Sequence, residues 1–373
     1  MLRFAFRFIS YDKPKSIGVV LGIVISTFLV GQQTGIFLFL TGAMASLVDN
    51  TRTDLWVVDH KTTNVNALGP IDVRVGRQLE SVPGVRKAYP FIVAGGTAKF
   101  EAGQSAPVQI IGVQPPMFRG GPWRIVDGAL TDLLEEGAVS VDVFERKNLN
   151  NAGMGTSFEI NGRRAHVAVV SRGVRGFGGI FMFTTATRAR EFGDIPSNKV
   201  SAFLVETRPG ADLQAIRDHI NATIFGVRAW TQKDFSRATV STILATSGIA
   251  LSIGTLIIFA VIAGMVIIGL TMYSAAVDRL RDYGTLKAIG ADNRYIRKLI
   301  MVQALIFGLV GYGIAVFFIQ GFRSGIGKSG ILFDYSPEIK IGFFVITILI
   351  AQAGAAFAMR RIAKIEPASV FRT

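Results

Sequence analysis

Residues 16–48 read SIGVVLGIVISTFLVGQQTGIFLFLTGAMASLV and contain no lysine, arginine, aspartate or glutamate. Three further uncharged stretches follow, at residues 238–277, 299–322 and 341–359. A bilayer core needs about 20 apolar residues in a helix that rises about 1.5 Å per residue. Each stretch is long enough to cross a membrane, so the sequence predicts four transmembrane helices.

The segment between the first two of these stretches, residues 49–237, is polar and long enough to form a folded domain. Apolar residues at helical spacing, from Ile71 to Val82 and over 212–224, mix with extended runs, and Asn161-Gly162 is a typical two-residue hairpin turn. This mixture lacks a regular βαβ order, which favours an α+β domain. The predicted fold class is a membrane protein that is α-helical with four transmembrane helices, plus one α+β extracytoplasmic domain inserted between helices 1 and 2.

Positive charge is concentrated in short segments beside the spans. Residues 1–15, 278–298 and 360–373 together hold 14 basic and five acidic residues, whereas 49–237 holds 23 basic and 19 acidic ones. Short basic segments stay in the cytoplasm, while long domains cross the membrane largely regardless of charge. Both termini are therefore expected in the cytoplasm, with 49–237 and the short loop 323–340 outside it. Of the chain's net charge of +14, the large domain carries only +4 (23 basic minus 19 acidic residues), and this charge is too dispersed to favour nucleic-acid binding.

The segments that flank the spans carry further expectations. Residues 1–15 place apolar and basic residues at helical spacing, which predicts an amphipathic helix on the cytoplasmic leaflet, and 360–373 form a cytoplasmic tail. The stretch Thr231 to Asp234 has the form of a capping box, and no proline follows it before Pro337. One unbroken helix from Thr231 to Val277, about 70 Å long, is therefore expected to carry movement through the membrane.

The link after the second span reads DRLRDYGTLKAIGA, residues 278–291. It resembles the R-x-x-E-I-G-x-L-K/R-A-I-G-A segment of the MacB/FtsX-like family of ABC transporter permeases. Residues 360–372 are similar to the A-x-x-x-P-x-x-x-L-R ending of that family, and residues 81–85 with Pro90 are similar to a P-G-V stretch of its outer domains. These matches follow the order of the family and cover nearly the whole chain.

Within the link, Asp282 and Tyr283 stand where the family usually has Glu followed by Ile or Val. Tyr283, Leu286 and Ile289 form an apolar strip on a short helix, and Gly290 is placed to end that helix. We expect this helix to dock into a groove of a cytoplasmic ATPase; the alternative is a basic loop that only sets the topology. The residues expected to couple the chain to the ATPase are Arg281, Asp282, Tyr283, Gly284, Leu286, Lys287, Ala288, Ile289, Gly290 and Ala291.

The resemblance also implies partners and a function. It implies a homodimer of type VII ABC architecture in the inner membrane of a bacterial cell, working with two copies of a cytoplasmic ABC ATPase. ATP-driven mechanotransmission would move the outer domain and drive efflux of a hydrophobic or amphipathic compound or a peptide, together with a periplasmic adaptor (membrane-fusion protein). Two alternatives stay open: FtsX-like signalling to an extracytoplasmic partner, and extraction of lipoproteins or lipids.

Catalytic and cofactor-binding patterns are absent from the sequence. It contains no G-x-x-x-x-G-K-S/T loop, so ATP and Mg²⁺ are expected on the partner ATPase and no cofactor on this chain. His60, His166 and His219 stand apart from one another and from acidic ligand motifs, and there is no cysteine, which argues against a metal site. The chain is therefore expected to be a transport subunit and not an enzyme.

The first span contains small residues that permit close helix packing. The patterns Gly18-x-x-x-Gly22 and Gly31-x-x-x-Gly35 are typical of tightly packed membrane helices. One interpretation is packing within a single chain; the other is a seam between two copies or a substrate cleft. The residues that the second interpretation places there are Gly22, Gly31, Gln32, Gln33 and Gly35.

Overall fold

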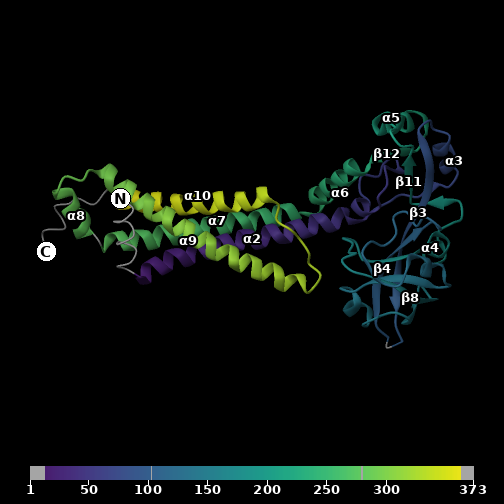
Figure 1. The fold of residues 1–373 in the computed structure, drawn as a ribbon, viewed down its shortest axis with the longest axis horizontal. Coiled ribbons are helices and arrows are strands. Elements are labelled where there is room, and N and C mark those ends of the chain that lie inside the picture. The colour runs from purple at the N-terminus through teal and green to yellow at the C-terminus, as the bar shows by residue number, and fades with distance from the viewer. Residues whose placement is uncertain (1–12, 102, 279, 363–373) are drawn as a thin grey trace. The chain divides into compact units, whose positions relative to one another are not determined.

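The computed structural model of the chain describes residues 13–101, 103–278 and 280–362. It divides into two compact units, which we call the helical unit (Met1–Phe39 with Ile249–Thr373) and the sheet unit (Leu40–Gly248) (Figure 1). Positions 1–12 of the amphipathic helix predicted at 1–15 lie outside the described residues. Of the predicted tail, positions 363–373 also lie outside them.

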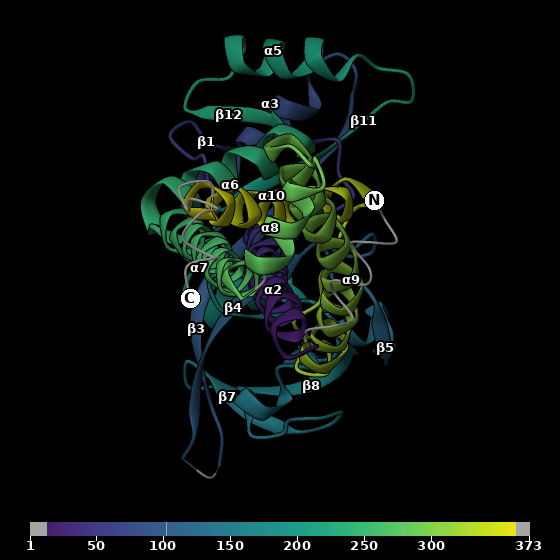
Figure 2. The same cartoon turned by 90° about the vertical axis from the view of Figure 1, so that its left-hand side faces the viewer.

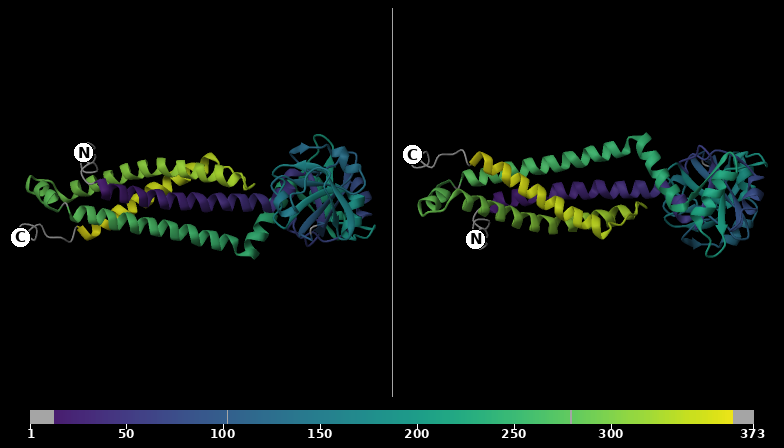
Figure 3. Two further views of the ribbon diagram at one scale, coloured as in Figure 1. Left: turned by 90° about the horizontal axis from the view of Figure 1, so that it is seen from below. Right: turned by 90° about the horizontal axis from the view of Figure 1, so that it is seen from above.

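Four helices of the described chain are long and apolar enough to cross a membrane. They are α2 (Lys13–Asn50), α7 (Ile249–Val277), α9 (Asn293–Gly327) and α10 (Pro337–Ile362), and a short helix α8 (Leu280–Ala288) lies between α7 and α9 in the sequence. In the helical unit, α10 packs against both α7 and α9 (Figure 3). The prediction of four transmembrane helices is confirmed.

Glycines allow the helices of this unit, seen nearly end-on in Figure 2, to approach one another closely. A Cβ atom placed on Gly311 of α9 would lie 2.5 Å from Ile23 Cγ2 of α2, and one placed on Gly354 of α10 would lie 2.7 Å from Ile268 Cγ2 of α7. Because neither distance leaves room for a methyl group, each glycine fixes the separation of a particular pair of helices.

The second span differs from the single long helix that the sequence predicts. Helix α6 (Gln232–Ser247) is capped by Thr231, whose side chain accepts a hydrogen bond from the Asp234 amide, but it ends at Gly248. Gly248 has φ 67°, in the left-handed region, and α7 begins at the next residue. The expectation of one unbroken helix is wrong because it counted prolines, whereas a glycine in the left-handed conformation ends a helix equally well.

The sheet unit is built on one ten-stranded mixed sheet with the order β12-β1-β11-β3-β7-β8-β5, to which β4, β9 and β6 attach as branches. Pairing is antiparallel except between β4 and β9 and between β6 and β8. The prediction of an α+β domain is confirmed. The sheet's strands are β1 (Leu55–Asp59), β3 (Val85–Lys99), β4 (Ser105–Val113), β5 (Ile125–Asp127), β6 (Ala138–Asp142), β7 (Ser157–Ile160), β8 (Arg163–Ser171), β9 (Ile180–Thr185), β11 (Ala202–Thr207) and β12 (Val227–Thr231).

Smaller elements complete the sheet unit. Strands β2 (Ile71–Asp72) and β10 (Lys199–Val200) pair separately, and Asn161 and Gly162, both with positive φ, form the predicted hairpin turn between β7 and β8. The shorter helices are α3 (Val75–Glu80), α4 (Ala186–Gly193) and α5 (Leu213–Thr223), with 3₁₀ turns at Leu130–Leu134 and Arg146–Leu149.

Strand β3 joins the two halves of the sheet because it is long enough to pair with both. Its first part pairs with β11, where Tyr89 lies opposite Leu204. Its second part pairs with β4, where Val93 lies opposite Ile111. A single strand therefore carries hydrogen bonds from one half of the domain to the other.

Alternate residues of a strand point to opposite faces of the sheet, and each face here has its own core. Leu55 and Val57 of β1 belong to one buried cluster, whereas Trp56 and Val58 belong to the other. This second cluster also contains Phe235 of α6 and residues from the end of α2. Both helices that connect the domain to the spans are thus part of its core.

Hydrogen bonds join the end of α2 to the start of α6. The Gln232 side-chain amide donates to the carbonyl oxygens of Val48 and Asp49, each at 2.9 Å. These carbonyls lie in the last turn of α2, where a helix has no partners of its own for them. Further along α6, Thr239 Oγ1 accepts a hydrogen bond from the Val65 amide at 3.1 Å. These hydrogen bonds therefore hold α6 to the end of α2 and to the segment that follows β1.

Phe235 occupies the centre of this junction. It is fully buried, and its ring centroid lies 5.5 Å from that of Trp56 and 6.0 Å from that of Trp230. Trp56 is held in turn by a 3.2 Å hydrogen bond from Nε1 to Thr51 Oγ1, just beyond the end of α2. One aromatic side chain of α6 therefore packs against two strands of the sheet, and Trp56 links it to Thr51, which follows α2.

We expect Phe235→Ala to lower the free energy of unfolding of the sheet unit by about 3–5 kcal/mol, because it leaves a cavity in a closed core. Tryptophan emission during urea unfolding of the full chain measures this loss, since Trp56 and Trp230 flank the cavity. The matched control is Phe225→Ala, whose side chain is fully exposed (102%), and which should change stability by less than about 0.5 kcal/mol. Equal stabilities of the two variants would contradict the central position of Phe235.

Candidate functional site

The link between the second and third spans folds as predicted into a short helix, α8. The Ala291 amide donates to the Leu286 carbonyl at 2.9 Å, and Gly290 has φ 102°, so the chain leaves the helix through a left-handed glycine. Asp292 then caps α9 by accepting a 2.7 Å hydrogen bond from the Tyr295 amide. The first feature ends α8 and the second begins α9, so the two helices are separated by only a few residues.

The predicted apolar strip of α8 does not form one continuous exposed face. Tyr283 is buried at 5% exposure and belongs to the same core cluster as Met272 and Ile296, and Leu286 packs against that cluster. Ile289 alone of the three is open, at 80% exposure. Tyr283 and Leu286 therefore anchor α8 to the helical unit, and docking of this helix on a cytoplasmic ATPase stays a prediction.

An ion pair places the start of the first span beside this link. Lys15 Nζ contacts Asp278 Oδ2, which joins α2 to the residue that follows α7. Among the predicted coupling residues whose burial the structure describes, Asp282, Ile289 and Gly290 are exposed. Of the other predicted coupling residues, Arg281, Gly284, Lys287 and Ala288 belong to α8, and Ala291 follows it.

The small residues of the first span pack within this chain. A Cβ atom on Gly22 would lie 2.8 Å from Ile267 Cγ2, one on Gly31 would lie 2.5 Å from Ile319 Cδ1, and one on Gly35 would lie 2.6 Å from Phe333 Cε2. The Tyr335 hydroxyl also donates a 2.8 Å hydrogen bond to the Gly31 carbonyl. Of the two interpretations, the geometry of these three glycines matches packing within a single chain.

Gln32 and Gln33 lie between two of those glycines and are both half-buried. The apolar residues Ile17, Leu21 and Ile25, spaced four apart on α2, are 57%, 52% and 50% exposed in the helical unit. Gln33 continues the same helical stripe. An exposed face therefore remains on α2, and the seam between two copies stays a prediction at that face.

Hydrogen bonds hold the start of a glycine-rich loop, residues 173–179. Asp142 Oδ2 accepts the Val174 amide at 2.8 Å, and the buried Glu145 carboxylate accepts Arg175 Nε at 2.6 Å. Ser46 of α2 donates to the Arg175 carbonyl at 2.7 Å. Burial raises the pKa of Asp142, even though hydrogen bonds to its carboxylate oppose the shift. The loop is thus tied to the last turns of α2, which its composition does not reveal.

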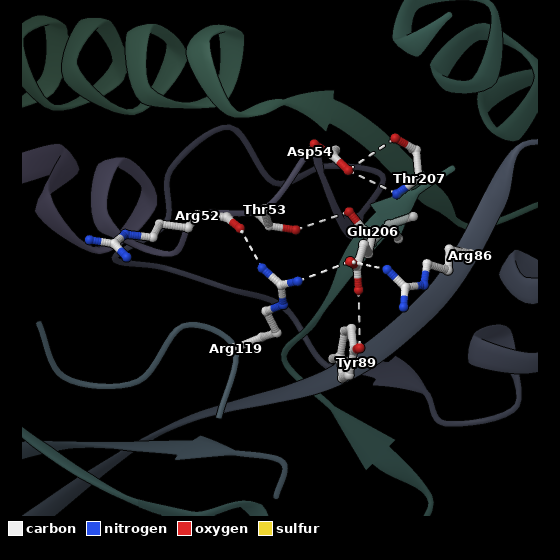
Figure 4. A network of polar contacts seen from close by, with 9 residues as sticks. Arg52, Thr53, Asp54, Arg86, Tyr89, Arg119, Glu206 and Thr207 are labelled. Carbon is white, nitrogen blue, oxygen red and sulfur yellow. Dashed lines mark hydrogen bonds and ion pairs between the residues drawn. The ribbon is translucent and has the colours of Figure 1, made fainter. Parts of the chain in front are cut away.

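A charged network lies on the sheet unit where the chain leaves α2 (Figure 4). Glu206 Oε1 accepts hydrogen bonds from Arg119 Nη2 at 2.9 Å and from Arg86 Nη1 at 3.0 Å, and the Tyr89 hydroxyl donates to Glu206 Oε2 at 3.1 Å. Burial, followed by the contact with Glu206, raises the pKa of Tyr89. A second carboxylate, Asp54, accepts hydrogen bonds from the amide and hydroxyl of Thr207.

This network borders a cavity of about 400 Å³. Arg119 Nη1 also donates to the Arg52 carbonyl at 3.3 Å, so the network contacts the segment that connects α2 to β1. Sequence reasoning missed this network because its members are far apart along the chain. The antiparallel register of β11 and β3 places Glu206 near Arg86 and Tyr89, and Arg119 reaches Glu206 from the segment between β4 and β5.

Metal-ligating side chains do not cluster in the described ranges 13–101, 103–278 and 280–362, where no group of three His, Cys, Asp or Glu residues is arranged to hold a metal ion. His166 Nε2 lies 3.1 Å from Glu135 Oε2 in an exposed pair.

These features define a multi-pass membrane protein with a sheet domain after its first span and an anchored helix between its second and third spans. A family model described as MacB-like periplasmic core domain matches residues 16–223, more than half of the chain, and one described as FtsX-like permease C-terminal matches 254–367. The chain belongs to the MacB/FtsX-like family of ABC transporter permeases.

Similar proteins are known from several organisms. The macrolide export ATP-binding/permease protein MacB of Vibrio parahaemolyticus is 23% identical over 94% of this chain and 56% of its own length. An uncharacterized ABC transporter permease of Methanocaldococcus jannaschii is 24% identical over 47% of this chain and 46% of its own length. The chain thus spans about half the length of these two relatives. An uncharacterized ABC transporter permease of Mycobacterium tuberculosis, 24% identical, matches over 94% of this chain and 95% of its own length.

Solved structures with a related outer domain also match. The periplasmic region of MacB from Actinobacillus actinomycetemcomitans aligns with 54% of this chain and 98% of its own, at 9% identity and a TM-score of 0.39. The extracellular domain of the noncanonic ABC-type transporter YknZ from Gram-positive bacteria aligns with 48% of this chain and 99% of its own, at 14% identity and a TM-score of 0.35. At these TM-scores the likeness carries no further argument.

We expect Glu206→Gln to destabilise the sheet unit by about 1–3 kcal/mol, because it removes the charge that pairs with Arg86 and Arg119. Urea unfolding followed by tryptophan emission measures the change. Glu159→Gln is the matched control, since Glu159 is an exposed strand residue, and it should change stability by less than about 0.5 kcal/mol. A Glu206→Gln variant as stable as the control would show that the network contributes nothing to the fold.

Proposed function

We propose that the chain is the permease subunit of an ATP-driven exporter that works by mechanotransmission. In this proposal two copies of the chain form a homodimer in the inner membrane of a bacterial cell, with both termini in the cytoplasm. Two copies of a separate cytoplasmic ATPase bind ATP and Mg²⁺. The observation that carries the proposal is α8, a short helix anchored to the helical unit by Tyr283 while Ile289 stays exposed.

The anchored helix α8 suits a coupling role. A displacement applied to the exposed Asp282 and Ile289 would pass into the bundle through Tyr283, because Tyr283 and Met272 of α7 lie in one close-packed cluster. A loop without that anchor would absorb the same displacement by bending. The proposed contact with the ATPase is therefore smaller than the strip suggested by the sequence, and centres on Asp282, Ile289 and Gly290.

Transmission toward the outer domain follows α7 and α6 along the chain. Helix α6 belongs to the core of the sheet unit through Phe235, whereas α7 belongs to the helical unit. Gly248 separates them in a left-handed conformation, and a Cβ atom added there would meet nothing within 4 Å. We assign Gly248 as a pivot about which movement of α7 is converted into movement of the sheet unit, in place of the rigid rod expected from the sequence.

The output of this movement is export on the far side of the membrane. The proposed substrate class is a hydrophobic or amphipathic compound or a peptide, handed to a periplasmic adaptor protein. The Vibrio relative, a macrolide export protein, supports this class. The large sheet domain supports export over pure signalling, since a folded domain of residues 40–248 offers cavities to a substrate.

We expect Ile289→Ala to reduce stimulation of the partner ATPase about tenfold or more, because truncating an apolar residue at the centre of an interface costs about 2 kcal/mol or more, and about 1.4 kcal/mol corresponds to tenfold. ATP turnover is measured with permease and ATPase reconstituted together in liposomes and compared with the ATPase alone. Leu332→Ala truncates another exposed apolar residue, at 45% exposure, outside α8 and serves as the control. Equal stimulation by both variants would remove Ile289 from the contact.

We expect Gly248→Ala to reduce coupled transport several-fold, because an alanine in the left-handed region costs about 1–2 kcal/mol and so favours joining α6 and α7 into one helix. The matched control is Gly254→Ala in α7, where an added Cβ atom also meets nothing within 4 Å but φ is not positive. Transport per ATP hydrolysed in liposomes is the readout. Transport by Gly248→Ala equal to that of Gly254→Ala would rule out a pivot at this position.

A further inference from the structure

A second cavity in the sheet unit adjoins the charged network around Glu206. It measures about 500 Å³ and lies between the chain that leaves α2, residues 50–52, and the segment 117–125, with Leu130 at its edge. Cavities that bind small molecules commonly have volumes of about 300–1,000 Å³. The cavity is therefore large enough for a small molecule.

The charges that line this cavity are all positive. Arg52, Arg119 and Arg124 line it, and none of its described lining residues carries a carboxylate. Arg119 is paired with Glu206, but its Nε is buried and has no hydrogen-bond partner in the described part of the chain. Arg52 and Arg124 are exposed and form no ion pair within the described ranges. Two guanidinium groups are thus available for an anion.

The rest of the wall is apolar and partly open. Met117 is 54% exposed, and Trp123 and Leu130 are half-buried against the core of the sheet unit. Methionine side chains adapt to ligands of varied shape, and a tryptophan face offers a large apolar contact. The wall therefore fits an apolar group, next to guanidinium groups that fit a negative one.

The backbone around the cavity is held in uncommon conformations. Arg52, Phe118 and Arg124 have φ of 49°, 46° and 54°, although none of them is glycine. Non-glycine residues avoid this left-handed region, and such conformations cluster at binding sites. Phe118 is buried at 6% exposure, so packing holds at least one of these conformations in place. The two unpaired arginines are therefore presented by a constrained backbone.

We propose that this cavity binds a single-chain amphipathic anion, with its apolar chain against Met117, Trp123 and Leu130 and its carboxylate or phosphate on Arg52 and Arg124. Guanidinium groups bind both kinds of anion through paired hydrogen bonds. The shared chemistry has two sources, a free fatty acid and a lysophospholipid. The inference rests on the sheet unit alone and does not depend on the export function or on the ATPase.

Tryptophan quenching by brominated ligands tests the site, because Trp123 lines the cavity and is half-buried, whereas Trp56 does not line it and is fully buried. The full chain is held in nanodiscs of phosphatidylcholine and titrated with 9,10-dibromostearate. We expect saturable quenching that Trp123→Phe abolishes. The methyl ester of the same probe, which lacks the charge, should bind at least tenfold more weakly.

Charge at the cavity is tested by the double variant Arg52→Asn and Arg124→Asn, since asparagine tolerates the left-handed conformation. We expect it to weaken binding of dibromostearate at least tenfold. Arg77→Gln with Arg164→Gln removes the same charge from exposed positions outside the cavity and should bind like the unaltered chain. The emission maximum and urea unfolding of each variant show whether it is folded.

The sources are separated by repeating the titration with dibrominated lysophosphatidic acid. Tighter binding of this probe assigns the cavity to lysophospholipids, and tighter binding of dibromostearate assigns it to fatty acids. The proposal is overturned if quenching does not saturate or survives in Trp123→Phe. It is equally overturned if the methyl ester binds as tightly as the free acid, a comparison that needs no charge variant.

Discussion

Packing around Phe235 is the constraint on which the rest of the sheet unit depends. This ring closes a core that includes Trp56 from the first strand and residues at the end of α2. The side-chain amide of Gln232 donates hydrogen bonds to two of the last carbonyls of α2. Because a helix end buried without such partners is costly, the start of α6 and the end of α2 stabilise each other. A movement of either helix must therefore carry the domain with it.

Close packing also distinguishes rigid from flexible positions along the helices. Gly22, Gly31 and Gly35 let neighbouring side chains approach α2 so closely that no larger residue fits. Tyr283 extends this close packing to α8. Gly248 and Gly290, by contrast, end helices in open surroundings. Glycine thus serves two opposite purposes in one chain, and only the surroundings of each one tell which purpose applies.

The sequence predicts the parts of the fold that depend on local pattern. Uncharged runs predict the spans, Asn161-Gly162 predicts a hairpin, and Thr231 predicts a helix start, because each depends on neighbours within a few residues. The break at Gly248 escapes such reasoning, since glycine in a membrane helix more often serves packing than termination. The direction of the α8 strip escapes it as well, because a periodic pattern does not say whether an apolar face meets a partner or the chain's own bundle.

The network around Glu206 is the least predictable part of the structure, since its members come from four separate segments that meet only in the folded sheet unit. No short motif marks it. Basic residues dispersed along the chain gave no sign that Arg52, Arg119 and Arg124 would line one cavity. Sites of this kind become visible only when strands distant in sequence are placed side by side.

The pairing of the first and last strands has a consequence for how such a chain arises. Leu55, the first residue of β1, lies opposite Thr231, the last residue of β12. The sheet domain therefore begins and ends at neighbouring points, as inserted modules commonly do. A segment with adjoining ends can be replaced by another of similar end spacing without disturbing the helices on either side. Recombination can thus give one set of membrane helices many different outer domains.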